Sequence, residues 1–202
     1  MWLVLLDRDG VLNEDRADYV KIPAELNLLP GAAAAVARLN RANAKVAVVS
    51  NQSAVGRGLI DESMLARIHE KLTASLAAEG ASLDAILVAP DAPDAATEWR
   101  KPGAGMLREA MEKFGAGADA TVMIGDSARD LVAAARIGCR RHLVRTGHGA
   151  HPLLQGVGLE CCPIEIVDDL AAAADRLLAD RRVAGRLAER AAGGGAERPG
   201  VR

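Results

Sequence analysis

Short apolar runs that each end in a polar cluster alternate with amphipathic or alanine-rich segments along this chain of 202 residues. The length and the Val, Ile and Leu content of the runs predict buried strands at 3–6, 45–49, 83–88, 121–124 and 141–144. Between them, apolar residues at three- and four-residue steps predict helices over 32–40 and 61–79, then helices ending at 114 and 137. An edge strand at 164–167 and a helix over 168–192 complete the pattern. Strands that alternate with helices predict an α/β fold with a parallel sheet covered by helices on both faces.

The first apolar run ends at two carboxylates, Asp7 and Asp9, which are separated by one residue and followed by Gly10. Glycine allows the chain to turn sharply at this point. Two close carboxylates repel each other unless a cation or a shared proton lies between them, which suggests a metal site built from oxygen ligands. A solvated turn would have the same spacing, so the motif alone leaves both interpretations open.

Polar residues follow the other predicted strands as well: Ser50 and Asn51 the second, Lys101 the loop after the third, and Asp126 the fourth. Ligands of open parallel sheets bind outside the carboxyl ends of the strands, so these residues predict one common site. Oxygen ligands without nearby His or Cys favour Mg²⁺. A metal, a lysine and small polar donors are the parts needed for phosphoryl transfer. One carboxylate could attack phosphorus while a second acid protonates the leaving oxygen and then activates water.

Composition argues against several other classes of protein. The net charge is −2 and no long basic run is present, so a nucleic-acid partner is not expected. The N-terminal apolar run is too short for a signal peptide or a membrane span. Three cysteines without a C-x-x-C pattern argue against a disulfide framework. We therefore expect a cytoplasmic protein without a membrane partner.

Four motifs of the chain, in this order, resemble those of the haloacid dehalogenase-like (HAD-like) phosphatase superfamily over about residues 2–147. They are Asp7-Arg8-Asp9-Gly10-Val11, the strand ending in Ser50-Asn51, Lys101 before Pro102, and Gly125-Asp126-Ser127-Ala128-Arg129-Asp130. Further segments are similar to the D-glycero-D-manno-heptose 1,7-bisphosphate phosphatases and the related histidinol-phosphatase domain. These segments are Leu12-Asn13, Gln52-Ser53, Arg57-Gly58, Arg100-Lys101-Pro102, Gly105-Met106-Leu107 and Val144-Arg145-Thr146-Gly147.

The resemblance implies a Rossmann-like, three-layer α/β/α fold with a mainly parallel sheet and a minimal cap. We expect one domain over residues 1–192 and a disordered tail over 193–202. The implied activity is Mg²⁺-dependent hydrolysis of a small phosphorylated sugar through an aspartyl-phosphate, with the C7 phosphate of the heptose bisphosphate favoured. Alternatives are histidinol phosphate, another small sugar phosphate, or a catalytically silent binding scaffold. A monomer is favoured, although nothing in the sequence determines the number of subunits.

The resemblance also implies a role for each matched residue. Asp7 would be the nucleophile and a metal ligand, and Asp9 the general acid/base that binds the metal through its backbone carbonyl. Asp126 would complete the metal site, and Asp130 would orient neighbours or cap its helix. Ser50, Asn51 and Lys101 would hold the transferring phosphoryl group. Arg100 would contact the far end of the substrate, and Asp15 and Tyr19 would be further substrate contacts.

One loop departs from the family pattern. Members commonly bind zinc after the third strand through Cys-x-His and then Cys-x-Cys, but this chain has Ala89-Pro90-Asp91 and Thr97-Glu98-Trp99 there. Asp91 alone cannot build a tetrahedral site, so no structural zinc is expected and Trp99 packing could order the loop instead. Arg57 could reach the site or be a surface charge. The four histidines lack metal-ligand spacing, and no functional role is expected for them.

Overall fold

The described part of the structure, a computed structural model covering residues 2–150 and 161–193, contains a six-stranded sheet in the order β3-β2-β1-β4-β5-β6. Every strand pair in it is parallel. The strands are β1 Trp2–Leu6, β2 Ala44–Asn51, β3 Ala85–Ala89, β4 Thr121–Gly125, β5 Arg140–Val144 and β6 Glu165–Val167. This arrangement confirms the expected α/β class, including the edge position of the last strand.

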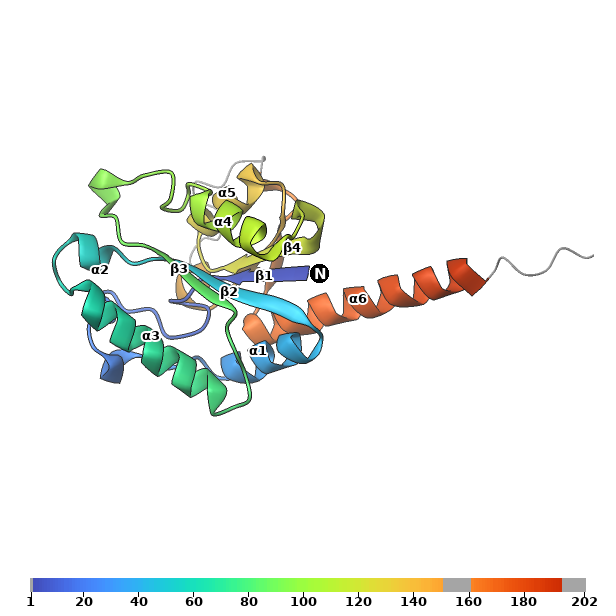
Figure 1. The fold of residues 1–202 in the computed structure, drawn as a ribbon, viewed down its shortest axis with the longest axis horizontal. Coiled ribbons are helices and arrows are strands. Elements are labelled where there is room, and N and C mark those ends of the chain that lie inside the picture. The colour runs from blue at the N-terminus through green and yellow to red at the C-terminus, as the bar shows by residue number, and fades with distance from the viewer. Residues whose placement is uncertain (1, 151–160, 194–202) are drawn as a thin grey trace, which may run out of the picture.

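Helices cover both faces of the sheet, as Figure 1 shows. One layer contains α1 (Ala32–Arg41), α3 (Glu62–Ala77) and α6 (Leu170–Gly193), and the other contains α4 (Gly105–Phe114) and α5 (Ala128–Arg136). Alternate residues of β1 face opposite layers, because successive strand side chains point to opposite sides. Val4 and Leu6 pack with the α1–α3–α6 layer, whereas Leu3 and Leu5 pack with the α4–α5 layer. Burial on both sides explains why this strand is continuously apolar in sequence.

Local capping signals agree with the observed helix ends. Asp61 caps α3 by accepting a hydrogen bond from the Met64 backbone N–H at 2.7 Å, as its position in the sequence predicted. Asp130 accepts hydrogen bonds from the backbone N–H and the hydroxyl of Ser127, which forms a capping box at the start of α5. The same carboxylate therefore stabilises the helix start and is available to the site described below.

Two details differ from the sequence prediction. β2 continues through Ser50 and Asn51, so these residues belong to the strand and do not follow it. A short helix, α2 (Ser53–Gly56), begins directly afterwards, and four residues are too few to show a helical period in sequence. Short 3-10 turns also lie at Pro23–Glu25, Pro93–Ala95 and Ala118–Ala120.

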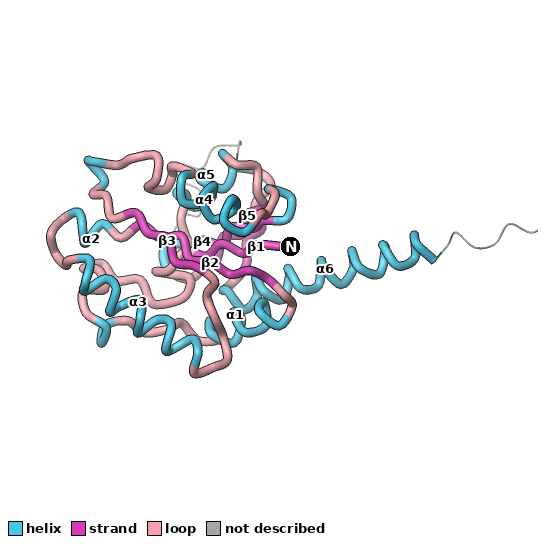
Figure 2. Tube along the Cα trace, viewed as in Figure 1, coloured by secondary structure: helices cyan, strands magenta, loops and turns pink. Residues whose placement is uncertain are grey.

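The order of the strands changes direction at β1, whose neighbours are β2 and β4. All strands are parallel, so the carboxyl ends of these three meet at one edge of the sheet, and such a point is the usual ligand site of an open α/β sheet. Figure 2 shows the loops and turns that leave this edge, in pink on the side opposite the N-terminus. The fold thus brings Asp7, Ser50 and Asp126 to a common position.

The last helix, α6, packs on α1 with its first turns and then continues away from the sheet (Figure 1). Arg38 of α1 forms an ion pair with Asp175 at 2.7 Å, and the Arg181 guanidinium lies over the Trp2 ring. None of the described helices is long and apolar enough to cross a membrane. The predicted tail after Gly193 and much of the predicted loop before Cys161 lie outside the described residues.

Candidate active site

Three carboxylates meet at the carboxyl edge of the sheet. Asp7 directly follows β1, Asp126 directly follows β4, and Asp130 lies in the first turn of α5; one oxygen of each lies within 4.8 Å of the others. Parallel pairing of β1 with β4 brings them together, and the Asp7 backbone N–H continues it by donating to the Ile124 carbonyl at 3.0 Å. Such a group of acids needs compensating positive charge.

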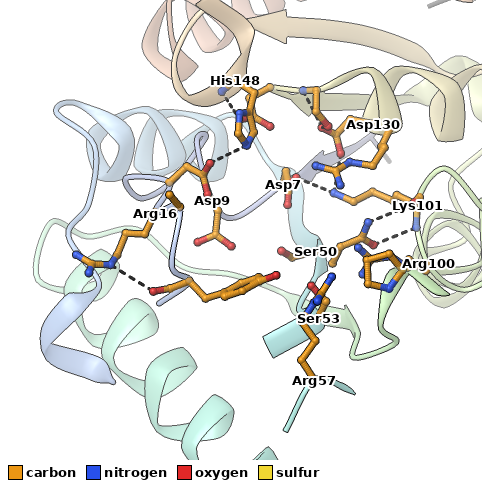
Figure 3. Close-up of a pocket in the computed structure, with 18 residues that line it drawn as sticks. Asp7, Asp9, Arg16, Ser50, Ser53, Arg57, Arg100, Lys101, Asp130 and His148 are labelled. Atoms are coloured by element: carbon orange, nitrogen blue, oxygen red, sulfur yellow. Dashed lines mark hydrogen bonds and ion pairs between the residues drawn. The ribbon is translucent and has the colours of Figure 1, made fainter. Parts of the chain in front are cut away.

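Lys101 supplies part of that charge from the other side of the site. Its side chain is only 1% exposed, and its Nζ lies 2.9 Å from Asp7 Oδ2 and 2.6 Å from Asp130 Oδ1 (Figure 3). Burial would lower the pKa of Lys101, but the two carboxylates outweigh it and raise that pKa, so the ammonium group stays charged. The Asn51 side chain fixes the Lys101 backbone by donating to its carbonyl at 2.9 Å and accepting from its N–H at 3.0 Å.

Lysine alone does not compensate all three acids. Burial, followed by the Asp130 and Asp7 charges, raises the pKa of Asp126 to about 8. Burial also raises the pKa of Asp7 to about 6, although Lys101 opposes it. Protonation or a cation would relieve this repulsion, and an all-oxygen cluster suits a hard divalent cation such as Mg²⁺. The residues present therefore fit the metal that the sequence analysis expected.

Two glycines from distant segments make room for the Asp126 carboxylate. A Cβ atom on Gly10 or on Gly147 would lie 2.2 Å from Asp126 Oδ2, and both glycines have positive φ values, 76° and 59°. Thr146 joins the two segments, because its hydroxyl donates to the Gly10 carbonyl at 2.6 Å. The His148 backbone N–H donates to Asp126 Oδ2 at 2.8 Å. The Thr146-Gly147 motif thus positions a candidate metal ligand.

Asp9 is held by three polar side chains. Arg8, 1% exposed, donates to both carboxylate oxygens at 2.9 Å, while Asn13 donates to Oδ1 at 2.8 Å and Gln52 to Oδ2 at 2.9 Å. Burial would raise the pKa of Asp9, but the Arg8 charge and these hydrogen bonds together lower it. The Gln52 amide also donates to Ser50 Oγ at 2.8 Å and so links Asp9 to a predicted phosphate ligand.

All of the predicted site residues line one pocket of about 370 Å³. Figure 3 shows Asp7, Asp9, Ser50 and Lys101 near its middle, with His148 and Arg57 at opposite sides. The predicted site residues along its wall are Asp7, Asp9, Asp15, Tyr19, Ser50, Asn51, Arg100, Lys101 and Asp126. Tyr19 has a φ of 66°, uncommon for a residue other than glycine, where the loop after β1 turns at the pocket.

Sequence reasoning missed several residues of the pocket wall: Arg16, Ser53, Arg129 and His148. Arg57 also lines it, which decides between the two interpretations of that residue. No functional role was expected for the histidines, but His148 lines the pocket, and its Nε2 lies 2.8 Å from Asp15 Oδ2. Its position just after the Thr146-Gly147 motif, beyond the carboxyl end of β5, was the available signal.

The segment from the end of β3 to Trp99 contains the four positions at which the family pattern places zinc ligands. In this chain they are Ala89, Asp91, Thr97 and Trp99. Trp99 packs against the α4–α5 side of the core, and its Nε1 donates to the Val88 carbonyl at 2.8 Å. This packing agrees with the role expected for Trp99. The Asp91 carboxylate accepts hydrogen bonds from the Thr97 hydroxyl and backbone N–H.

Comparison with known proteins places these features in a family. The HAD-hydrolase-like family model matches residues 98–173. A D-glycero-beta-D-manno-heptose-1,7-bisphosphate 7-phosphatase from Bordetella bronchiseptica is 42% identical over 181 residues, which cover 88% of this chain and 98% of that protein. An enzyme of the same name from Pseudomonas aeruginosa is 39% identical, covering 87% of this chain and 97% of its own.

A solved structure agrees with these sequence relatives. The D,D-heptose 1,7-bisphosphate phosphatase of B. bronchiseptica, complexed with magnesium and phosphate, superposes with a TM-score of 0.84 at 41% identity. The match covers 89% of this chain and 99% of that structure. The similarity therefore extends over both the sheet and the segments that form the pocket.

Proposed function

The chain belongs to the D-glycero-beta-D-manno-heptose-1,7-bisphosphate 7-phosphatase family of HAD-like hydrolases, and from this premise we propose how its pocket acts. The protein is a phosphoric monoester hydrolase. Its substrate is D-glycero-D-manno-heptose 1,7-bisphosphate, from which it removes the C7 phosphate. The same pocket that holds the reacting phosphate also accommodates the phosphate at C1.

Asp7 is the nucleophile of the proposed reaction. A carboxylate oxygen of Asp7 forms a bond to phosphorus while the bond from phosphorus to the sugar C7 oxygen breaks, which gives an aspartyl-phosphate. Water then attacks this phosphorus and releases inorganic phosphate and free Asp7. Lys101, 2.9 Å from Asp7, stabilises the negative charge of the transferring group, and the Ser50 hydroxyl is placed to donate to it.

Asp9 moves the protons. It donates one to the departing C7 oxygen and then removes one from the attacking water. Its low pKa in the ligand-free protein suits the second step. A phosphate dianion brought beside Asp9 would raise that pKa and so favour the first step, because like charges disfavour ionisation.

Asp7, Asp126 and the backbone carbonyl of Asp9 are the proposed Mg²⁺ ligands. When bound, Mg²⁺ would neutralise the carboxylate cluster and withdraw charge from the phosphoryl oxygens. Asp130 remains outside this set, because one of its oxygens pairs with Lys101 and the other accepts from Ser127. Its role is to hold the ammonium group of Lys101 toward Asp7.

The observation that carries the choice of a bisphosphate is the group of arginines on the pocket wall. Arg57, Arg100 and Arg129 all line the pocket, in addition to Lys101. Burial, followed by the neighbouring Arg129 charge, lowers the pKa of Arg100, and Arg57 adds to this effect. Guanidinium groups that repel each other in the free protein are favourably placed for a second phosphate, which they can bind in bidentate fashion.

The same arginines argue against the alternative substrate. Histidinol phosphate carries a cationic amino group at the end that does not react, and three guanidinium groups would repel it. A silent scaffold is not supported either, because Asp7, Asp9, Ser50, Lys101 and Asp126 are all present and brought together in one pocket.

A substrate panel tests the proposal. Mg²⁺-dependent phosphate release is measured from the heptose bisphosphate, heptose 7-phosphate, histidinol phosphate and p-nitrophenyl phosphate. We expect the highest kcat/KM for the bisphosphate. Phosphorus NMR of the sugar product should show that the phosphate it retains is at C1. Asp7→Asn should abolish turnover on every substrate, whereas Asp175→Asn on the exposed face of α6 should not. A higher kcat/KM for histidinol phosphate, or turnover by Asp7→Asn, would contradict the proposal.

A further inference from the structure

Arg100 is nearly buried, yet it lies at the end of a loop with little regular structure. Between β3 and Arg100 the only regular element is the 3-10 turn Pro93–Ala95. The Arg100 side chain is 6% exposed, and its Nη1 donates to the Asp91 carbonyl at 2.9 Å. The orientation of the guanidinium therefore depends on where the loop places the peptide group of Asp91.

The remaining donors of Arg100 are available to a ligand. Within residues 2–150 and 161–193, no hydrogen bond or ion pair is found for Arg100 Nε or Nη2, and the side chain lines the pocket. A guanidinium group recognises phosphate through paired N–H donors in a fixed plane, so a small rotation weakens both bonds together. Arg100 can recognise a second phosphate only if the Asp91 peptide is held in place.

Two hydrogen bonds between Asp91 and Thr97 hold that peptide. Asp91 Oδ2 accepts from the Thr97 hydroxyl at 2.5 Å and from the Thr97 backbone N–H at 3.2 Å. The first of these is the main reason why the pKa of Asp91 is lowered, which keeps the acceptor charged. These bonds close the loop across its 3-10 turn.

Thr97 is also connected to Arg100 through the backbone. The Thr97 carbonyl accepts from the Arg100 N–H at 3.2 Å, and the Thr97 hydroxyl accepts from the Trp99 N–H at 3.2 Å. At the start of the loop, the Gly56 N–H donates to the Pro90 carbonyl at 3.0 Å. A Cβ on Gly56 would lie 2.5 Å from that carbonyl oxygen, so the loop packs closely on α2.

We propose that Asp91 and Thr97 are positioning residues, which hold the Arg100 guanidinium toward the second phosphate and thereby set the preference for a bisphosphate. This inference rests on the proposed function, because the effect is defined by the second phosphate. Neither residue lines the pocket, and the groups proposed to act on the reacting phosphate are Asp7, Ser50 and Lys101. Losing their hydrogen bonds should therefore change recognition and leave the chemical step intact.

Matched substitutions at Thr97 test this inference. Thr97→Val keeps the shape and removes the hydroxyl, whereas Thr97→Ser keeps the hydroxyl. We expect Thr97→Val to lower kcat/KM for the heptose bisphosphate roughly tenfold, mainly through KM, with little change for p-nitrophenyl phosphate. Thr97→Ser should retain most of the wild-type efficiency. Thr73→Val, at an exposed position of α3 away from the pocket, is the control and should change neither substrate.

A double-mutant cycle with Arg100→Ala shows whether Thr97 acts through Arg100. If it does, Thr97→Val should cause no further loss in the Arg100→Ala background, because the group that it positions is gone. Additive losses, equal losses on both substrates, or a Thr97→Ser enzyme as weak as Thr97→Val would each overturn the inference. If Thr97→Val does not fold, Asp91→Asn takes its place in the same cycle, because it keeps the side-chain shape and weakens the acceptor of the Thr97 hydrogen bonds.

The panel separates this inference from the proposed function. A wild-type enzyme that does not prefer the bisphosphate would overturn both. A wild-type preference that Arg100→Ala removes and Thr97→Val leaves unchanged would overturn only the positioning role of Asp91 and Thr97.

Discussion

The ammonium group of Lys101 lies 2.6 Å from Asp130, a carboxylate that is fully buried. Asp130 thereby connects the start of α5 to the reaction centre, because its other oxygen accepts hydrogen bonds from Ser127. Lys101 would otherwise have Asp7 as its nearest acidic partner, and that carboxylate must be free to attack phosphorus. The pair therefore contributes both to stability and to the proposed chemistry.

Asp130→Asn should lower both the stability of the protein and its rate of turnover. Removing one partner of a buried ion pair costs about 3–5 kcal/mol, and the remaining Asp7 should keep the loss near the lower end of that range. Lys101 would move toward Asp7 and weaken it as a nucleophile, so kcat should fall at least roughly tenfold. Chemical denaturation and turnover of p-nitrophenyl phosphate measure the two effects. An Asp130→Asn enzyme with wild-type kcat would show that Asp130 does not position Lys101.

Gly147→Ala should weaken Mg²⁺ binding. The added Cβ would lie 2.2 Å from Asp126 Oδ2 and 2.6 Å from Gly10 Cα, so the proposed metal ligand must move. Gly115→Ala is a matched control, because Gly115 has the same φ of 59° but a Cβ added there would meet no atom within 4 Å. We expect the Mg²⁺ concentration for half-maximal thermal stabilisation to rise at least roughly tenfold for Gly147→Ala only. Equal behaviour of the two variants would attribute the effect to backbone strain.

The Asp7 and Asp126 carboxyl groups should contribute less to the stability of the metal-free protein as pH rises from about 4 to about 8, whereas His69, whose pKa is lowered to about 4 mainly by burial, acts in the opposite direction below about pH 6.5. The pKa of Asp7 is raised to about 6 and that of Asp126 to about 8, so the folded state binds these protons more tightly than the unfolded state does. When the pKa of a carboxyl group is higher in the folded protein than in the unfolded chain, its proton stabilises the folded state. This stabilisation is complete at a pH below the pKa of the unfolded chain and is lost as the pH rises past the pKa in the folded protein. Mg²⁺ binds the deprotonated carboxylates, so its stabilising effect should increase over the same range.

Thermal unfolding with and without Mg²⁺ across this pH range measures the effect. Asp126→Asn is the informative variant, because it removes the carboxyl group with the higher pKa. Its metal-free stability should lack the loss between about pH 4 and pH 8 that Asp126 causes, and Mg²⁺ should stabilise it little. A Mg²⁺ effect that is constant with pH in the wild type would contradict the raised pKa values.

Purified protein should contain no stoichiometric zinc. The positions that the family pattern assigns to zinc ligands are occupied by Ala89, Asp91, Thr97 and Trp99, and the Asp91 carboxylate is already hydrogen-bonded to Thr97. Elemental analysis after dialysis measures this directly, and a chelator that binds zinc without binding Mg²⁺ should leave the activity unchanged. One equivalent of tightly bound zinc would show that other residues of the chain bind it.

Much of the fold follows from short-range patterns. Continuous apolar runs identified the sheet strands because both faces of a parallel sheet are buried, and Asp61 and Ser127 predicted helix starts because capping is a local interaction. The short helix α2 and the extension of β2 through Asn51 were missed, because a four-residue helix has no period and polar residues rarely mark a strand interior.

The sequence by itself determined which residue types reach the carboxyl edge of the sheet, since parallel strands place the residues that follow them at one edge. Only the tertiary structure decided how those side chains are partnered. Asn51 bonds to the Lys101 backbone, Gly147 packs against Asp126, and His148 pairs with Asp15, each across a separation of many residues. Such contacts depend on the packing of whole elements against one another, which no local spacing or propensity encodes.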